Sequence, residues 1–195
     1  SMKKVGLFFG TFNPIHQAHL ILANHLVENS LIDELWFVIS PRSPFKLKQQ
    51  MLSNNHRYQM VYEAIAEYPK FKVNTIEFDL PQPNYTIDTL VRLEEKYPNL
   101  EFYLIMGEDN LAHFHKWKNA DAILAHYHIM VYPRVQKTEI QEKYIDHPKM
   151  IWTDGPILEL SSSYVRKQIK ESKEYRSLVP PEVFKYIDEM NFYRK

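Results

Sequence analysis

The chain contains no cysteine, which excludes a disulfide framework and a thiol nucleophile. No apolar run approaches the roughly 20 residues of a membrane span, and the N-terminus lacks the apolar segment of a signal peptide. The 24 basic and 24 acidic side chains give a formal net charge of zero, so bulk charge favours neither nucleic acid nor an anionic membrane as a partner. Any phosphate binding must therefore be local, and we expect a cytoplasmic protein.

Glycine is also scarce, with four residues in the whole chain. Two of the four, Gly10 and Gly107, directly follow apolar runs that predict strands, Val5–Phe9 and Glu101–Met106. A residue without Cβ lets backbone approach a ligand closely. Both strand ends are therefore predicted to face one ligand crevice of an open α/β sheet.

The remaining patterns alternate strands with helices. A chain of 195 residues with 45% hydrophobic content fits one domain over residues 1–195, with Ser1 before Met2 interpreted as a cloning remnant. Further strands are predicted at 34–39, 71–78, 128–132 and 150–153, and helices at about 15–27, 56–68, 85–97, 119–125, 138–145, 162–169 and 182–190. This order predicts a doubly wound, mostly parallel α/β sheet with a small C-terminal helical part.

The most informative stretch is VGLFFGTFNPIHQAHLILA, residues 5–23. Asn13-Pro14 is a turn signal, and the apolar spacing that follows predicts a helix whose first turn carries His16 and His19. Two imidazoles three residues apart lie on one side of a helix, beside free N–H groups and the positive end of the helix dipole, which suits a phosphate. The alternative is that they are ordinary polar residues at a helix start. Zinc binding is disfavoured because the HExxH spacing is absent.

Three other segments carry groups that bind anions. Lys46 lies in a basic Pro/Ser loop after the predicted second strand, and a solvated loop is the alternative there. Tyr85 and Thr86 start a helix, with a plain capping motif as the alternative. Ser161 or Ser162 caps a helix that also carries Arg166, so hydroxyls, N–H groups and a guanidinium converge at its start.

Two motifs carry a family resemblance. GTFNPIHQAHL resembles the (G)GTFDPxHxGHL signature of the HxGH-motif nucleotidyltransferase superfamily, and LSSSYVR at 160–166 is similar to its second signature, ISSTxIR. Asn13 stands where the family usually has Asp, and Ala18 where it usually has Gly. NYTIDTL at 84–90 resembles the SYTIDTL motif of the bacterial nicotinate (nicotinamide) mononucleotide adenylyltransferases. The resemblance covers the whole chain and implies a Rossmann-like nucleotidyltransferase fold.

The resemblance also implies an activity and a set of site residues. The activity is adenylyl transfer from ATP to nicotinate mononucleotide in NAD biosynthesis, with Mg²⁺ held mainly by the substrate phosphates. The implied catalytic residues are His16, His19, Lys46 and Arg166, where Lys46 matches a phosphate-binding lysine although Phe45 departs from the usual His. The implied ATP-binding residues are Gly10, Thr11, Phe12, Gly107, Asp109, Arg134, Ser161 and Ser162. The implied mononucleotide-binding residues are Asn13, Tyr85, Thr86 and Trp117, the last as a ring stacked beside nicotinate.

Several alternatives stay open at this point. The acceptor could instead be nicotinamide mononucleotide or phosphopantetheine, and the chain could be a non-catalytic nucleotide-binding sensor. The intact His16, His19 and Arg166 argue against a sensor, while NYTIDTL and Trp117 disfavour phosphopantetheine. The oligomeric state is not predicted, with a homodimer as one option.

Overall fold

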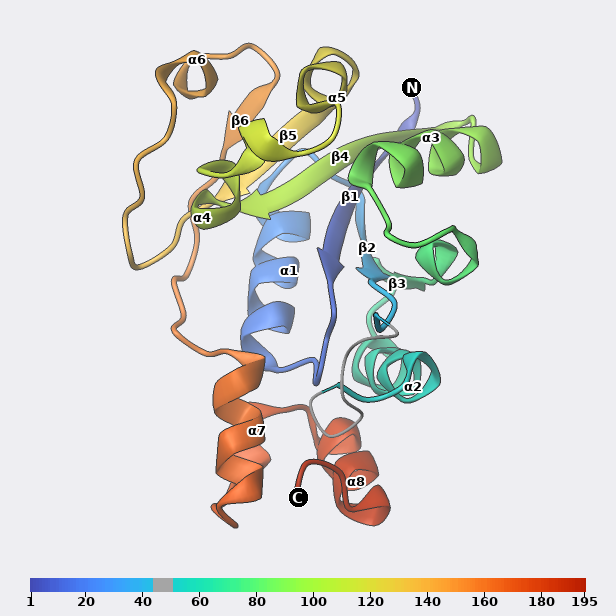
Figure 1. The fold of residues 1–195 in the computed structure, drawn as a ribbon, viewed down its shortest axis with the longest axis vertical. Coiled ribbons are helices and arrows are strands. Elements are labelled where there is room, and N and C mark those ends of the chain that lie inside the picture. The colour runs from blue at the N-terminus through green and yellow to red at the C-terminus, as the bar shows by residue number, and fades with distance from the viewer. Residues whose placement is uncertain (44–50) are drawn as a thin grey trace.

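A twisted sheet with helices on both faces forms the centre of the molecule in the computed structural model, which describes residues 1–43 and 51–195 (Figure 1). The strands lie in the order β3-β2-β1-β4-β5-β6, and all five pairings are parallel. Their bounds are β1 (Lys3–Gly10), β2 (Glu34–Ile39), β3 (Phe71–Asn74), β4 (Leu100–Gly107), β5 (His128–Tyr132) and β6 (Met150–Trp152). The predicted doubly wound fold is confirmed, and its sheet is parallel throughout.

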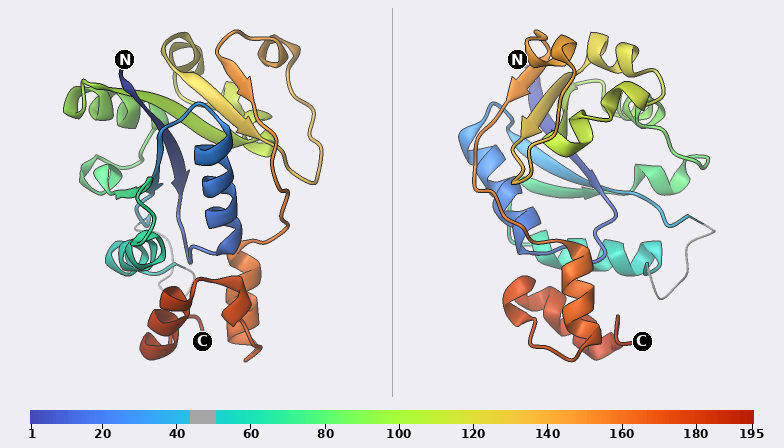
Figure 2. Two further views of the ribbon diagram at one scale, coloured as in Figure 1. Left: turned by 180° about the vertical axis from the view of Figure 1, so that it is seen from behind. Right: turned by 60° about the vertical axis from the view of Figure 1, so that its left-hand side comes forward.

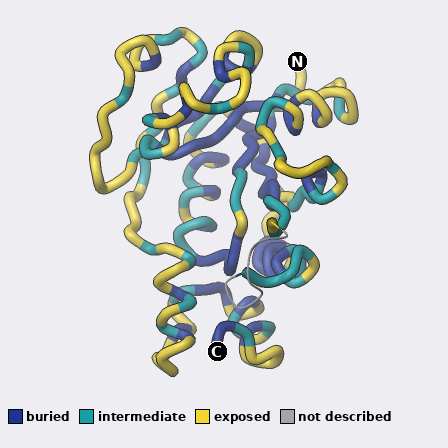
Figure 3. The backbone as a smooth tube through the Cα atoms, in the orientation of Figure 1, coloured by how far each residue is buried: buried dark blue, intermediate teal, exposed yellow. Residues whose placement is uncertain are grey.

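Two hydrophobic clusters cover the two faces of the sheet, because successive side chains of a strand point to opposite faces. Phe8, Phe37 and Met130 pack against α1 (Gln17–Asn29), α2 (Asn54–Ile65), α7 (Ser162–Lys170) and α8 (Pro181–Met190). Leu7 and Leu104 pack on the other face, against α3 (Thr86–Lys96), α4 (Glu108–Leu111), α5 (Ala120–His126) and α6 (Glu142–Ile145). Figure 3 shows the resulting pattern, with buried strands inside and exposed helix surfaces outside.

The C-terminal helical part lies beyond the carboxyl end of β1, toward which the arrow of that strand points (Figure 2). After β6 the chain runs as an extended segment to α7, then through the 3-10 helix η3 (Arg176–Leu178) to α8, which packs on α2. This arrangement places α7 and α8 next to the loop that follows β1.

Two predicted elements were wrong in extent. The strand predicted at 71–78 ends at Asn74, and the 3-10 helix η1 (Ile76–Asp79) follows it. The Asn74 side chain accepts a hydrogen bond from the Ile76 N–H at 2.9 Å, a local turn that ends the strand. Of the helix predicted at 138–145, only Glu142–Ile145 is helical. None of the described helices is long and apolar enough to cross a membrane.

Candidate active site

A cavity of about 270 Å³ lies at the carboxyl ends of β1 and β5, between the start of α1 and the start of α7. It is therefore at the edge of the sheet where open α/β folds bind ligands. Its lining combines imidazole, hydroxyl and guanidinium groups with an apolar wall: Phe8, Phe9, His16, Ala18, His19, Leu22, Tyr132, Pro133, Arg134, Pro156, Ile157, Leu158, Leu160, Ser161 and Ser162. Five of the predicted site residues thus share one cavity.

The two histidines are stacked at the N-terminus of α1. His16 is the N-cap residue and His19 lies in the first turn, with ring centroids 3.7 Å apart. The backbone N–H of His16 donates to Nδ1 of His19 at 3.1 Å, so Nδ1 carries no proton and the neutral ring of His19 carries its proton on Nε2. Burial lowers the pKa of His16 to about 4, and burial together with the His16 charge lowers the pKa of His19. Both rings are neutral hydrogen-bond donors at pH 7.

This burial makes stability depend on pH. Because the pKa of His16 is about 4 in the folded chain against 6.5 as its ordinary value, the unfolded chain binds a proton first as the pH falls. The free energy of unfolding should therefore drop as the pH falls from 6.5 toward 4, with about 2 kcal/mol from His16 alone between pH 7 and pH 5. Denaturant unfolding at both pH values checks this. The drop should shrink by about that amount in His16→Gln but not in His115→Gln, where the ring is exposed; equal drops in both variants would contradict it.

The start of α7 brings hydroxyl groups to the same place. Ser161 caps the helix, its Oγ accepting from the Tyr164 N–H at 3.1 Å. The Ser162 hydroxyl donates to the Pro14 carbonyl at 2.8 Å. One turn later, Nη1 of Arg166 donates to the Asn13 carbonyl at 2.8 Å. The two sequence motifs, about 150 residues apart, are therefore joined by direct hydrogen bonds.

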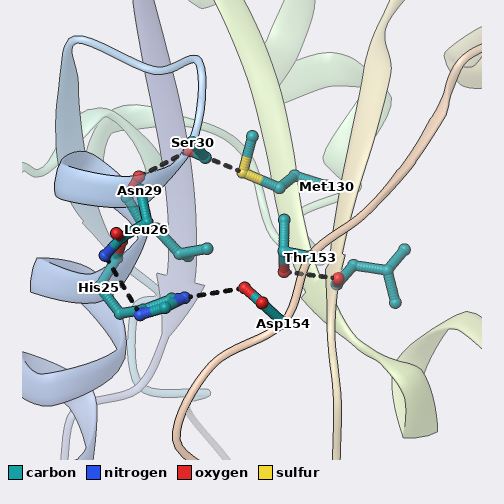
Figure 4. Close-up of polar contacts among 8 residues, drawn as sticks. His25, Leu26, Asn29, Ser30, Met130, Thr153 and Asp154 are labelled. Atoms are coloured by element: carbon teal, nitrogen blue, oxygen red, sulfur yellow. Dashed lines mark hydrogen bonds and ion pairs between the residues drawn. The ribbon is translucent and has the colours of Figure 1, made fainter.

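The wall of the cavity opposite α1 is the extended segment 153–160, and Figure 4 shows how its beginning is fixed. The Thr153 hydroxyl donates to the Val131 carbonyl at 2.8 Å, and Asp154 pairs with Nε2 of His25 on α1 at 3.2 Å. Gly155 follows with φ +145°, and a Cβ there would lie 2.7 Å from the His25 ring. The segment thus runs along α1 and presents Ile157 and Leu158 to the cavity, two residues that the sequence patterns did not identify.

The end of β4 contributes a charged pair beside this cavity. Asp109 lies 3.8 Å from Nε of Arg134, an ion pair that is about half exposed. Gly107 permits the approach of Asp109, because a Cβ at Gly107 would lie 2.6 Å from its carboxylate and 3.0 Å from the ring of Tyr132. Gly107, Asp109 and Arg134, each expected to bind ATP, therefore lie close together, and Arg134 lines the cavity itself.

The loop after β1 departs from its predicted use. Gly10 ends β1 and Thr11 is exposed, but the Phe12 side chain is 2% exposed and packs against the rings of Phe8 and His19. The Phe12 side chain is therefore buried in the protein and does not line the cavity. The Asn13 side chain, predicted to contact the mononucleotide, is also 2% exposed. Its Oδ1 accepts hydrogen bonds within the protein, from the Leu52 N–H at 3.2 Å and the Tyr193 hydroxyl at 2.7 Å.

The remaining mononucleotide-binding candidates form a second group on the other face of the sheet. Tyr85 caps α3 without a side-chain hydrogen bond, and Lys118 lies over its ring at 4.6 Å. That contact brings Trp117, which is half-buried against Phe114, to the neighbourhood of the α3 start. Since the Asp88 and Thr89 N–H groups bond to the Tyr85 carbonyl, the N–H groups of the two preceding helical residues have no partner within the helix.

Two buried charged residues, one beside the loop after β1 and one beside α3, were not identified from the sequence. Arg57 is fully buried and bonds to backbone carbonyls at the ends of β1 and β2. Glu77 is 4% exposed and accepts from the Thr89 hydroxyl at 2.8 Å; burial raises the pKa of its carboxyl, against the hydrogen bonds from Thr89 and Ser40. The signal for Arg57 was present, because Arg57, Met60, Val61 and Ala64 follow the i, i+3, i+4, i+7 spacing of a buried helix face.

One predicted site residue has no described position. Lys46, predicted to bind phosphate, lies outside the described residues. Over residues 1–43 and 51–195, no three or more His, Asp or Glu side chains are grouped so that they could hold a metal ion.

A parallel sheet with paired imidazoles, hydroxyls and a guanidinium at its carboxyl edge defines a nucleotidyltransferase. The family model described as "Cytidylyltransferase-like" matches residues 7–168. Proteins named "Probable nicotinate-nucleotide adenylyltransferase" from Christiangramia forsetii and Flavobacterium psychrophilum are 53% and 51% identical over 192 residues. These matches cover 98% of this chain and 99% and 100% of the relatives. The chain belongs to the nicotinate-nucleotide adenylyltransferase family.

Solved structures agree on the fold. The nicotinic acid mononucleotide adenylyltransferase of Plasmodium falciparum, solved in complexes with NaAD and with APC, matches with a TM-score of 0.79 in both cases. The alignment covers 98% of this chain and 97% of the other, at 22% identity.

Proposed function

We propose that this chain transfers the adenylyl group of ATP to nicotinate mononucleotide, giving nicotinate adenine dinucleotide and pyrophosphate. The observation that carries the proposal is the cavity in which His16 and His19 of α1 meet Ser161 and Ser162 of α7. These groups are hydrogen-bond donors at two helix N-termini, and that combination suits the phosphates of a nucleotide. Membership of the nicotinate-nucleotide adenylyltransferase family supports the choice of substrates.

The reaction follows from the charge of the two substrates. A phosphate oxygen of the mononucleotide attacks the α-phosphorus of ATP, and the bond from that phosphorus to the bridging oxygen breaks, with its electron pair leaving on pyrophosphate. Because the attacking phosphate is already anionic, no general base is needed, and positioning and charge stabilisation supply the catalysis. In this proposal His16 and His19 donate to the phosphates, and Arg166 exchanges its bond to the Asn13 carbonyl for the β and γ phosphates.

The remaining predicted residues fit around this centre. Backbone atoms of Gly10 and Thr11 lie between the two nucleotides, while Asp109 and Arg134 face the adenosine. Mg²⁺ would enter with ATP and neutralise phosphate charge. Imidazole, hydroxyl and guanidinium groups suit phosphate oxygens better than a hard cation, so the ion would be held mainly by phosphates, and we propose no protein ligand for it.

The acceptor is chosen at the start of α3. There the N–H groups of Thr86 and Ile87 have no partner within the helix, and they favour a carboxylate over a neutral carboxamide through charge-assisted hydrogen bonds and the helix dipole. A carboxamide would turn its own N–H donors toward one of them, at a cost of roughly 1–3 kcal/mol. Nicotinate mononucleotide should therefore exceed nicotinamide mononucleotide by about five- to 160-fold in kcat/KM.

A single substitution tests the assignment to these N–H groups. Thr86→Pro deletes one N–H, yet proline is suited to the first position of a helix, and Tyr85 before it already has the extended backbone, φ −115° and ψ 138°, that a residue preceding proline requires. We expect this variant to lose most of the preference for nicotinate, whereas Thr86→Ala retains it. The measurement is pyrophosphate release with ATP and each acceptor in turn, phosphopantetheine included.

The same assay separates the alternatives. The proposal is supported if nicotinate mononucleotide gives the highest kcat/KM for pyrophosphate release. If another acceptor gives a higher kcat/KM, that acceptor is the substrate instead. No release with any acceptor, from protein that binds ATP, identifies a nucleotide sensor instead. If Thr86→Pro keeps the full preference, the start of α3 does not choose the acceptor.

A further inference from the structure

The loop between β1 and α1 is held by side chains from three distant parts of the chain. Every one of these side chains donates a hydrogen bond into residues 11–14. Three of the bonds go to backbone carbonyls, from Arg57 to Thr11, from Arg166 to Asn13 and from Ser162 to Pro14, each at 2.8 Å. The loop leads directly to His16, so whatever fixes it also fixes the first turn of α1.

The fourth donor is Tyr193, which follows α8. Its hydroxyl donates to Oδ1 of Asn13 at 2.7 Å, across 180 residues of sequence. Tyr193 is 8% exposed, belongs to the hydrophobic cluster of α1, α2 and α8, and has a positive φ of 67°. A left-handed backbone is unfavourable for a tyrosine, and tertiary contacts of this side chain are what stabilise it there.

The path from this bond to the reacting groups is short and fully packed. Asn13 is followed by Pro14 and Ile15, both buried, and then by His16, which is 3% exposed. In a close-packed interior no empty space absorbs the movement of a side chain, so its neighbours move with it. A shift of Asn13 therefore reaches the imidazoles, and a misplacement of the order of 1 Å can reduce turnover by up to about a hundredfold.

We propose that Tyr193 is a positioning residue for adenylyl transfer. Its hydroxyl holds Asn13, and through the loop 11–14 it keeps His16 and His19 aimed at the nucleotide phosphates. The inference rests on the function proposed above and adds to it the segment after α8, where Tyr193 is the fourth of the described side chains that donate into the loop. It also gives Asn13 a use, since its amide oxygen is the acceptor shared by Tyr193 and the Leu52 N–H.

A tyrosine that merely anchors α8 is the competing explanation, and the chain offers two matched controls for it. Tyr175 is 3% exposed in the same cluster, and its hydroxyl is buried with no hydrogen-bond partner among the described residues. Tyr186 on α8 has its hydroxyl 2.7 Å from Nδ1 of His56, away from the loop. Removing these hydroxyls tests burial and α8 anchoring without touching Asn13.

The experiment measures kcat and both KM values of Tyr193→Phe, Tyr175→Phe and Tyr186→Phe by pyrophosphate release with ATP and nicotinate mononucleotide. We expect Tyr193→Phe to lower kcat about tenfold with each KM within about threefold, because the reacting groups are displaced while substrate contacts remain. The two controls should keep kcat within twofold. Unfolding midpoints of all variants report any purely structural loss, which would not lower the kcat of folded enzyme.

A double-variant cycle then assigns the effect to the bond. Asn13→Ala should lower kcat at least as much as Tyr193→Phe, and the double variant should be no slower than Asn13→Ala alone, since both remove the same contact. If the losses in kcat of Asn13→Ala and Tyr193→Phe multiply in the double variant, the inference is overturned. A kcat of Tyr193→Phe equal to that of Tyr175→Phe would overturn it as well. Should Tyr193→Phe not fold, an unchanged kcat of Asn13→Ala overturns it equally. An inactive wild-type protein would instead overturn the proposed function.

Discussion

Replacing His19 by alanine should lower kcat for dinucleotide formation by about 10²- to 10³-fold while the KM for ATP changes only a few-fold. The reason is the preset tautomer. The His16 N–H bonds to Nδ1 of His19, so the proton on Nε2 is held in place before substrate binds. A donor that is fixed in advance stabilises the charge developing on the leaving pyrophosphate without reorganising, and its loss is felt mainly in the transition state.

Single-turnover and steady-state pyrophosphate release measure this effect. The matched control is His126→Ala at the end of α5, because His126 is exposed and does not line the cavity; its kcat should stay within about twofold. His19→Asn, which keeps an N–H donor, should recover part of the loss. A folded His19→Ala enzyme with near-normal kcat would remove His19 from the mechanism, and a loss confined to the KM for ATP would make it a binding residue only.

Much of the fold could be predicted because local pattern and global position agree in this chain. The strands 34–39 and 128–132 were predicted with their observed bounds, since continuous apolar runs suit strands that are buried on both faces. The apolar pattern gave the wrong strand end where a side chain forms a hydrogen bond with the backbone in place of the pairing between strands. Asn74 turns the chain after β3, and nothing in the apolar spacing of 71–78 records that bond.

In the candidate site, too, residues with a local sequence signal were predicted and residues held by long-range contacts were not. Residues at helix starts, such as His16 and Ser161, were predicted as site candidates because turn and capping residues mark a helix N-terminus in the sequence. Arg57 and Tyr193 were missed because their partners are 46 and 180 residues away. Long-range hydrogen bonds leave no periodic signal. The apolar spacing of α2 marks Arg57 as a buried position but does not indicate its partners, and Tyr193 lies in a terminal segment without an apolar period.

Arg57 also carries the largest expected effect on stability. Its guanidinium is fully buried, and burial lowers its pKa to about 10, so it remains charged at pH 7. Nη1 donates to the Thr11 carbonyl at 2.8 Å and to the Ser40 carbonyl at 2.7 Å, which joins the loop after β1 to the loop after β2. Nε donates to the Leu52 carbonyl at 2.9 Å. One buried side chain thus donates to three backbone carbonyls, in the loop after β1, the loop after β2 and the residues before α2.

Arg57→Met fills a similar volume but donates nothing, so those carbonyls lose their partner around a side chain that is fully buried. The free energy of unfolding should fall by roughly 3–5 kcal/mol, because three hydrogen bonds from a charged donor are lost and each contributes about 1.5–3 kcal/mol before water replaces part of them. Denaturant unfolding at pH 7 measures this. Arg57→Lys should lose nearly as much, because an ammonium cannot reproduce the planar fork that reaches both loops. Arg92→Met is the matched control, since Arg92 is exposed on α3 and contacts Glu95 only at 3.5 Å; its loss should stay within about 0.5 kcal/mol. If Arg57→Met and Arg92→Met lose the same amount, the two loops are held by backbone pairing alone, and the guanidinium is not what joins them.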